Sequence, residues 1–373
     1  MAVYTPINKS ADYFNDVAYS GTGSTGQSIT VGFQPDFIWV KARNQSYDHV
    51  LFDSARGFST STTGTQISPN LTAAQPSTTG GHVGTTTSTT WTTKNGTAGT
   101  SLANVGDGSA TYINYNWKAG TTTGLATDGN TNITPASYSF NDTAKVSIIK
   151  WVGTGVDGAY LPHGLGVVPE FFIIKNTTDA EDWVCYHVGL TNALTVGTNQ
   201  SFIELNSSAA QQTGTGIWYS TVPGSVNIRV ANDNEVNATS DNYIGYFWRG
   251  VKGYSKFGSY IGNDDANASP FIYTGFKPAI VLIKDRGNTE NWFINGTSLN
   301  PANPTASFGG AIIPNSTAVE TTTNGGYSMD LTSNGFKPRA NAGQINGVDQ
   351  TYLYCAWAEN PFVTSDSVPT TAR

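Results

Sequence analysis

The sequence predicts an all-β fold built from three tandem antiparallel β-sandwich modules of jelly-roll or lectin-like type. Charged residues make up only 12% of the 373 residues and aromatic residues another 12%, while Gly, Thr, Ser and Asn are abundant. Thr and aromatic residues suit pleated strands, and Gly and Asn suit tight turns. A proline-led apolar stretch, GFQPDFIWVK at 32–41, also has two later counterparts. The composition therefore predicts strands, and the recurrence predicts repeats.

Three landmarks recur along the chain at nearly constant spacing. The first is a proline six residues before a lysine, in 32–41, in LGVVPEFFIIK (165–175) and in GFKPAIVLIK (275–284). The second is a Tyr five residues before a Trp, in YINYNW, YIGYFW and YLYCAW; the prolines precede these tryptophans by 82, 79 and 79 residues (117 − 35, 248 − 169, 357 − 278). The third is an aromatic residue two positions before a glycine. The three aromatic residues are Tyr19, Trp151 and Tyr260.

Each landmark indicates a particular element. The runs FIWV, FFII and IVLI after the prolines are continuously apolar, which is typical of strands covered on both faces. Proline fits the first position of such a strand, where no ladder donor is needed. In the closing strands, the spacing of five puts Tyr and Trp on opposite faces. We therefore expect these strands to be buried on both sides, or to join a core to an interface.

The landmarks also set the predicted domain boundaries. A chain of 373 residues exceeds the ~250–300 at which single cores stop growing. The first 17 residues precede the pattern of module 1 but are too apolar for a solvated tail, so we interpret them as a docking arm. The prediction is an arm at 1–17, module 1 at 18–118, a Thr/Gly/Asn-rich linker or hairpin at 119–145, module 2 at 146–250, module 3 at 251–363 and a flexible tail at 364–373.

Charge and hydropathy exclude several classes of function. The formal net charge is −7 without a local basic cluster, which argues against nucleic-acid binding. No apolar run approaches the ~20 residues that span a bilayer, and the first residues do not follow the order of a signal peptide, so we expect no membrane insertion and no classical export. Cys185 and Cys355 lie in apolar, strand-like contexts; a disulfide is open, but we expect two buried reduced thiols.

Two glycine motifs match a nucleotide-binding fingerprint. GTGSTG (21–26) and GTGVDG (153–158) both satisfy G-x-G-x-x-G. The fingerprint requires a helix that receives the pyrophosphate, and the sequences that follow have no helical period. Because both motifs occupy equivalent places in two repeats, we interpret them as glycine-rich turns.

Acidic residues and histidines near the shared lysine raise the question of metal or acid–base chemistry. At positions 7, 8 and 12 after the lysine, the three modules carry Asp48, His49 and Asp53; Asp182, Trp183 and His187; and Asn291, Trp292 and Gly296. The set of polar residues at these positions differs from module to module, whereas a tryptophan occupies the position eight residues after the lysine in the second and third modules. We therefore interpret His49 as a hydrogen-bonded strand residue rather than a metal ligand.

No other motif assigns a catalytic, cofactor-binding or metal-binding residue. The loops 263–267 (NDDAN) and 231–242 (ANDNEVNATSDN) offer oxygen ligands for calcium, but neither has the EF-hand spacing, and we favour surface turns. There is no G-x-S-x-G motif. Paired carboxylates for glycoside cleavage remain open, because partners can come from distant loops. Asn-x-Ser/Thr triplets are numerous, as expected from the composition. The sequence assigns no binding residues.

The strings GFQPDFIWVK, FDSARGF, HGLGVVPEFFIIK, WRGVKGYSKFGSYIGN, TGFKPAIVLIK and YLYCAWAENPF resemble a family of repeat-built virion proteins of tailed bacteriophages, particularly phages of marine bacteria. The resemblance extends from about Tyr13 to Phe362. It implies a non-enzymatic tail-fibre, spike or capsid-surface protein, assembled in the host cytoplasm and located in the virion.

The resemblance also implies partners. We expect a homotrimer, because such fibres usually gain avidity from three chains and because the doubly apolar closing strands have more apolar surface than one thin sandwich needs to cover. We also expect contact with other virion proteins through the N-terminal arm, and attachment to a host surface glycan or protein without any cofactor. The alternative is an enzyme, a sandwich-fold depolymerase that hydrolyses host surface polysaccharide.

Overall fold

The computed structural model confirms the all-β prediction, with antiparallel sheets and two short 3₁₀ turns, η1 (Ser10–Asp12) and η2 (Gly325–Tyr327). No helix in the described part of the chain is long and apolar enough to cross a membrane. The structure describes residues 4–58, 65–75, 81–95, 103–191, 200–214, 216–219, 223–299, 303, 310–321, 325–366 and 368–369.

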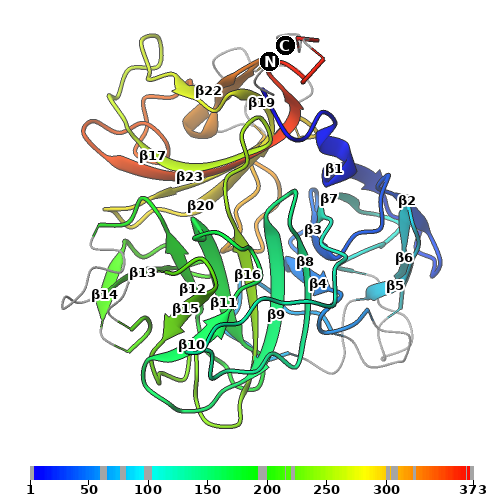
Figure 1. Cartoon of the computed structure of the whole chain (residues 1–373). Helices are drawn as coiled ribbons and strands as arrows, with labels where there is room; N and C mark the ends of the chain where they lie inside the picture. Colours follow the sequence, from blue (N-terminus) through cyan, green and yellow to red (C-terminus); the bar gives the residue numbers. More distant parts are fainter. Residues whose placement is uncertain are drawn as a thin grey trace.

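Three large sheets share one strand order, in which a closing strand lies between an opening strand and the proline-led strand. The first sheet runs β1 (Phe14–Ser20), β7 (Thr111–Trp117), β3 (Phe37–Ala42), β4 (Val50–Asp53). The second contains β9 (Val146–Val152), β16 (Asn242–Trp248), β11 (Phe171–Asn176), β12 (Trp183–His187). The third runs β17 (Ser255–Ile261), β23 (Thr351–Pro361), β19 (Phe276–Asp285), β20 (Trp292–Gly296). Figure 1 shows the sheets as blue, green and yellow-to-red lobes around a common centre.

The second sheet is wider than the other two. On one side it adds β8 (Ser137–Asn141), and on the other β13 (Gln200–Glu204) and β14 (Gln212–Gly214). Strand β8 pairs with β9 along its whole length, so part of the predicted linker at 119–145 is a hairpin strand.

A small sheet covers the outer face of each large sheet. The small sheets are β2 (Ser28–Thr30), β6 (Thr90–Lys94), β5 (His82–Thr86); β10 (Ala159–Pro162), β15 (Asn227–Val230); and β18 (Ile272–Tyr273), β22 (Gly335–Pro338), β21 (Met329–Thr332). Apolar side chains of each small sheet and the large sheet behind it form one buried cluster per pair. Each pair is thus an antiparallel sandwich, as predicted.

The inner faces of the three large sheets form one shared core. The closing tryptophans Trp117, Trp248 and Trp357 meet there, with ring centroids 5.3 to 6.0 Å apart. One continuous buried cluster contains residues from all three sheets. The closing strands are therefore buried on both faces, by their own sandwich and by the other two sheets. The boundaries predicted for the three modules stay a prediction, because this core does not divide the chain into separate units.

A tyrosine corner explains why each module begins with aromatic-x-Gly. The hydroxyl of Tyr243 donates to the carbonyl of Asn234 (2.8 Å) and accepts from the amide of Ala238 (2.7 Å). A Cβ on Gly153 would collide with the carbonyl oxygen of Ala238, so only glycine fits beside this turn. Trp151 stacks on Tyr243 at 5.3 Å. The same contacts recur at Tyr112 with Gly21 and at Tyr352 with Gly262.

The segment at 1–17, predicted to be a docking arm, contributes residues to the first sheet and to the shared core. Strand β1 begins at Phe14, which pairs with Trp117, so the first sheet requires this segment. Phe14 is 1% exposed and Ile7 is 2% exposed, both within the shared core. Ile7 and Phe14 are therefore buried against the chain itself, and docking of this segment on other virion proteins stays a prediction.

The N-terminal segment also holds the third sandwich and the C-terminal end. Thr5 Oγ1 donates to the carbonyl of Lys252 (2.9 Å), and Asn8 Nδ2 donates to Ser365 Oγ (2.6 Å). The described segments nearest the two ends of the chain lie together beside the third sheet (Figure 1). The predicted flexible tail at 364–373 is described only at 364–366 and 368–369, and Ser365 is held by this contact.

Candidate functional site

The three repeated lysines join neighbouring modules in a ring. Each side chain is fully buried, and each Nζ donates to carbonyl oxygens of its own module and of another one. The contacts between modules are Lys41 to Thr317 (3.1 Å), Lys175 to Thr72 (2.8 Å) and Lys284 to Ser208 (3.1 Å). Burial lowers the pKa of each lysine to about 8. The feature that revealed the repeat is therefore a structural junction.

The residue eight positions after each lysine makes a second contact between modules. Trp183 Nε1 donates to the carbonyl of Leu71 (2.9 Å), and Trp292 Nε1 donates to that of Glu204 (2.8 Å). In module 1, His49 takes this place, with Nε2 2.9 Å from the carbonyl of Ile313. Its Nδ1 accepts from Trp39 Nε1 (2.9 Å), so Nε2 carries the proton. Both nitrogens of His49 are used, and burial lowers its pKa far below the usual value.

The structure does not bring the other sequence-predicted residues into one site. Asp53 is buried, accepts from Arg56 Nε (2.6 Å), and accepts from the hydroxyl of Tyr246 in the second sheet (2.7 Å). His187 lies with Nε2 3.1 Å from the carbonyl of Tyr354, and its Nδ1 accepts from the amide of Gly189 (2.9 Å). Burial lowers the pKa of His187 to about 4. Both ring nitrogens of His187 are thus used, and both carboxylate oxygens of Asp53 accept hydrogen bonds, so these side chains have structural roles at the junctions.

The remaining predictions concern thiols and the acidic turn at 263–267. Cys185 and Cys355 are free and buried in the shared core, in line with the expectation of reduced thiols. The carboxylate of Asp265 accepts from the amides of Asn267 (2.8 Å) and Ala268 (2.9 Å), so this loop is a self-capped surface turn.

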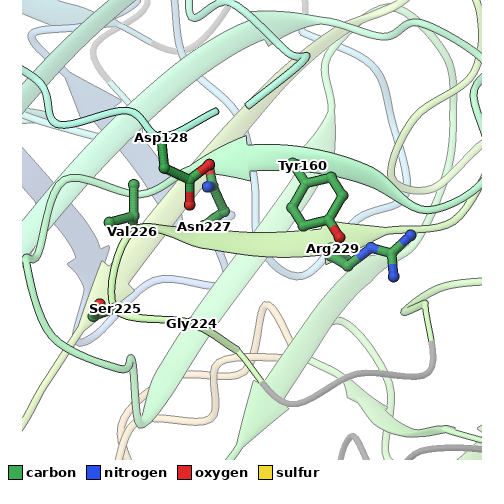
Figure 2. Close-up of a pocket in the computed structure, with 7 residues that line it drawn as sticks. All are labelled: Asp128, Tyr160, Gly224, Ser225, Val226, Asn227 and Arg229. Carbon is green, nitrogen blue, oxygen red and sulfur yellow. The ribbon is translucent and has the colours of Figure 1, made fainter. Parts of the chain in front are cut away.

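A surface pocket lies over the small sheet of module 2. It has a volume of about 290 Å³, and Figure 2 shows the side chains around it. Tyr160 from β10 and Arg229 from β15 are paired neighbours on one side, and Asp128 and Asn227 lie on the other. The complete lining is Asp128, Tyr160, Gly224, Ser225, Val226, Asn227 and Arg229.

Arg229 is held in place by stacking rather than by an ion pair. Its guanidinium lies 3.9 Å from the ring centroid of Tyr219 and 4.5 Å from that of Tyr160. Arg229 Nε donates to the carbonyl of Gly158 (3.0 Å). A Cβ on Gly158 would collide with this stack, and Gly158 has φ +77°, so the last glycine of GTGVDG makes room for the arginine.

The opposite wall of the pocket comes from the predicted linker. Asp128 Oδ1 accepts from the amides of Asn130 (2.9 Å) and Thr131 (3.1 Å). Thr131 Oγ1 donates to Asn227 Oδ1 (3.0 Å), which fixes the segment against β15. Asn227 is 6% exposed, and its Nδ2 has no hydrogen-bond partner among the residues that the structure describes. The pocket therefore presents a fixed cation and a carboxylate, and its wall contains a buried amide donor without a partner among the described residues.

Module 2 also contains a cluster of carboxylates, Asp182, Glu204 and Glu235, whose oxygens lie within 4.8 Å of one another. Asp182 immediately precedes β12, Glu204 is the last residue of β13, and Glu235 comes from the acidic loop at 231–242. Oxygen ligands of this kind suit hard divalent cations. Asp182 already accepts from Asn206 (2.6 Å) and Glu204 from Gln212 (2.6 Å). Burial, and then the neighbouring negative charges, raise the pKa of Glu235 to about 8.

The sequence profile of one family, described as a domain of unknown function (DUF7483), matches residues 9–361. The chain belongs to the DUF7483 family. No curated protein and no solved structure matches it. The family match covers all three large sheets, so the junctions and the pocket both lie within the DUF7483 region.

Sequence reasoning missed an asparagine that completes each junction of this DUF7483 chain. Asn70, Asn206 and Asn315 follow the lysines by 29, 31 and 31 residues (70 − 41, 206 − 175, 315 − 284), each within an Asn-x-Ser/Thr triplet. Asn206 Oδ1 accepts from the amide of Trp183 (2.8 Å), and the others do the same for His49 and Trp292. The carbonyl that receives the lysine belongs to the third residue of each triplet. The triplets were visible, but only their spacing from the lysines distinguishes them.

Glu235→Gln is expected to stabilise the DUF7483 chain near neutral pH. Because its folded-state pKa of about 8 exceeds the usual 4.5, the stability that Glu235 contributes is complete below pH 4.5 and is lost as the pH rises towards 8. Because glutamine is neutral at every pH, the variant avoids this loss. Its free energy of unfolding at pH 7 should exceed that of the wild type by on the order of 1 to 2 kcal/mol, after allowance for solvent screening. Thermal unfolding at pH 7 and pH 4 measures the effect, with the exposed Asp157→Asn as the control. Equal midpoints at pH 7 would show that the carboxylate cluster is not strained.

Proposed function

We propose that this protein is a non-enzymatic structural component of a tailed-bacteriophage virion, a tail fibre, spike or capsid-surface fibre that contributes to host attachment. The observation that carries the attachment role is the pocket on module 2. Its arginine is fixed between two tyrosines, and its amide and carboxylate are held by backbone and side-chain contacts. Fixed polar groups in an open pocket favour binding, because little side-chain entropy is lost when a ligand arrives.

The scaffold suits such a role. The three sandwiches share one core and are tied by buried lysine contacts, so a surface site on one of them has a rigid support. The strings that resemble virion proteins include all three proline-led strands, which lie inside this scaffold.

Two measurements test the two parts of this proposal. Mass spectrometry of purified particles, with density located by electron microscopy, is expected to find the protein in the virion, and its absence from particles would refute the virion role. Fluorescently labelled protein is expected to bind intact host cells and to bind them less after surface glycans are stripped. Equal binding to stripped cells would point to a protein receptor instead, and no binding at all would refute attachment.

The expected homotrimer stays a prediction. The doubly apolar closing strands that suggested it are buried between sheets of the same chain, so this apolar surface no longer requires a second copy. The trimer then rests on the gain in avidity that three copies give a weak binding site. Light scattering at micromolar concentration measures the mass directly, and the mass of a single chain would exclude the trimer.

A depolymerase is the second candidate, and one observation favours it. A carboxyl group that keeps its proton near neutral pH, such as Glu235, is the kind of general acid that glycoside cleavage uses. However, the oxygens of its cluster lie within 4.8 Å, whereas the paired carboxyl groups of glycosidases are ~5 to 9.5 Å apart, and none of the three lines the pocket. Release of reducing ends from host polysaccharide, lost in Glu235→Gln, would establish the enzyme. We expect no release from the wild-type protein.

A further inference from the structure

We propose that the pocket on module 2 binds an acidic carbohydrate, with a sugar carboxylate on Arg229 and sugar hydroxyls on Asp128 and Asn227. The inference rests on the proposed attachment function and names the chemistry of its ligand. Three observations support it: the unused donors of Arg229, the spare amide of Asn227, and the charge balance between the two ends of the pocket.

Arg229 is prepared to receive a carboxylate. Only its Nε is used in a hydrogen bond, to Gly158, and no ion pair or hydrogen bond to a described residue uses Nη1 or Nη2. The two tyrosine rings fix the plane of the guanidinium, which leaves its forked edge available. A planar fork of N–H donors matches a carboxylate through two parallel hydrogen bonds, and fixing it beforehand lowers the entropy cost.

The other end of the pocket suits hydroxyl groups. Asp128 Oδ1 is occupied by loop amides, and its Oδ2 has no hydrogen bond among the described residues. Within the described part of the chain, Asn227 Nδ2 is a buried donor without a partner, a costly arrangement unless a ligand or water satisfies it. A sugar hydroxyl can donate to a carboxylate while it accepts from an amide, so this acceptor and donor together match one or two adjacent hydroxyls.

Charge and size narrow the ligand further. The pocket carries one arginine and one aspartate. Arg229 therefore attracts a single negative charge on a ligand, whereas Asp128 repels a negative charge and favours neutral groups at its end of the pocket. A dianionic phosphate ester would bring excess negative charge towards Asp128, which disfavours it. A volume of about 290 Å³ is at the small end of the ~300–1,000 Å³ typical of ligand pockets, and fits one unit of a chain that continues into solvent.

The test compares acidic oligosaccharides with their carboxyl-reduced forms, which keep the same hydroxyls and linkages. The probes are oligomers of galacturonate, glucuronate-containing oligosaccharides and sialyl-oligosaccharides, measured by calorimetry against the full-length protein. At least one acidic probe is expected to bind ten-fold or more tightly than its reduced partner. Arg229→Gln should abolish that preference and leave the reduced partner unaffected, whereas Asp128→Asn should weaken both. Arg339→Gln, which removes an arginine from another partly exposed site, is the control.

The outcomes separate the inference from the function on which it rests. Equal binding of acidic and reduced probes, no binding of any acidic probe, or a preference that survives Arg229→Gln would overturn the acidic-sugar assignment. Competition by inorganic phosphate at the same concentration as the sugar would overturn it in favour of a phosphate ligand. If the acidic preference holds but labelled protein fails to bind host cells, the site stands and the attachment function falls. If labelled protein binds host cells strongly and Arg229→Gln does not change that binding, the attachment function stands, and the pocket is not the site that carries it.

Discussion

Trp248→Ala is expected to lower the free energy of unfolding by about 3 to 5 kcal/mol, the usual cost of truncating a large buried aromatic side chain. Trp248 is 3% exposed and packs against Trp117 at 6.0 Å, Trp357 at 5.9 Å and Phe171 at 5.4 Å. Because these contacts join three sheets, the cavity would weaken the whole molecule and not module 2 alone. We expect one cooperative transition at a lower denaturant midpoint, followed by far-ultraviolet circular dichroism.

The control for Trp248→Ala is Val152→Ala, on the neighbouring strand β9, where the side chain is 45% exposed. Its midpoint should stay close to that of the wild type, because the two half-exposed methyl groups that are removed contribute little. An unmoved midpoint for Trp248→Ala would contradict the shared core. Two separate transitions would show that the sandwiches unfold independently, and would support the three predicted modules as separate domains.

Phe14→Ala is expected to cost a similar amount, about 3 to 5 kcal/mol. Phe14 packs on Trp117 at 5.0 Å and on Trp357 at 6.1 Å, so it closes the shared core from the N-terminal side. Deleting residues 1–17 should be more damaging still, because it also removes Ile7 and half of β1. The deletion is expected to give insoluble or largely unfolded protein.

Asp12→Ala is the control for the N-terminal segment, since Asp12 makes only an exposed ion pair with Lys9. Surface pairs of this kind contribute little to stability, so its midpoint should not change. If the chain without residues 1–17 folded with the wild-type midpoint, the segment would be a dispensable arm after all. Such a result would support the prediction that residues 1–17 dock on other virion proteins.

The sequence predicted the elements of the fold better than their assembly. The proline-led runs and the closing Tyr–Trp strands fall where β3, β11, β19 and their partners lie, because continuous apolar runs and alternating faces are local properties of a strand. The glycine motifs were correctly interpreted as turns, because no helical period follows them. What the pattern could not show is that Gly158 also makes room for Arg229, a residue 71 positions later.

The candidate site was almost wholly outside the reach of sequence reasoning. Asp128 lies in a segment interpreted as a linker, and Arg229 is a lone charged residue within the short strand NIRV. The only signal was the position of Arg229 between two buried apolar neighbours, Ile228 and Val230, which turns its side chain to the opposite face. That signal indicates an exposed arginine but does not say what lies beside it.

By itself, the sequence determined the all-β class, the three repeats, the buried strands and the turns that need glycine, since each depends on residues close together in the chain. Only the tertiary structure decided that the three tryptophans share one core, that each lysine reaches a loop of another module, and that residues 1–17 complete the first sheet. These contacts join residues that are 76 or more positions apart. Apolar periodicity shows that one face of a strand must be covered, but it does not show which residues cover it. Here the inner face of each large sheet is covered by the other two large sheets of the same chain, because three sheets of equal strand order close around one centre.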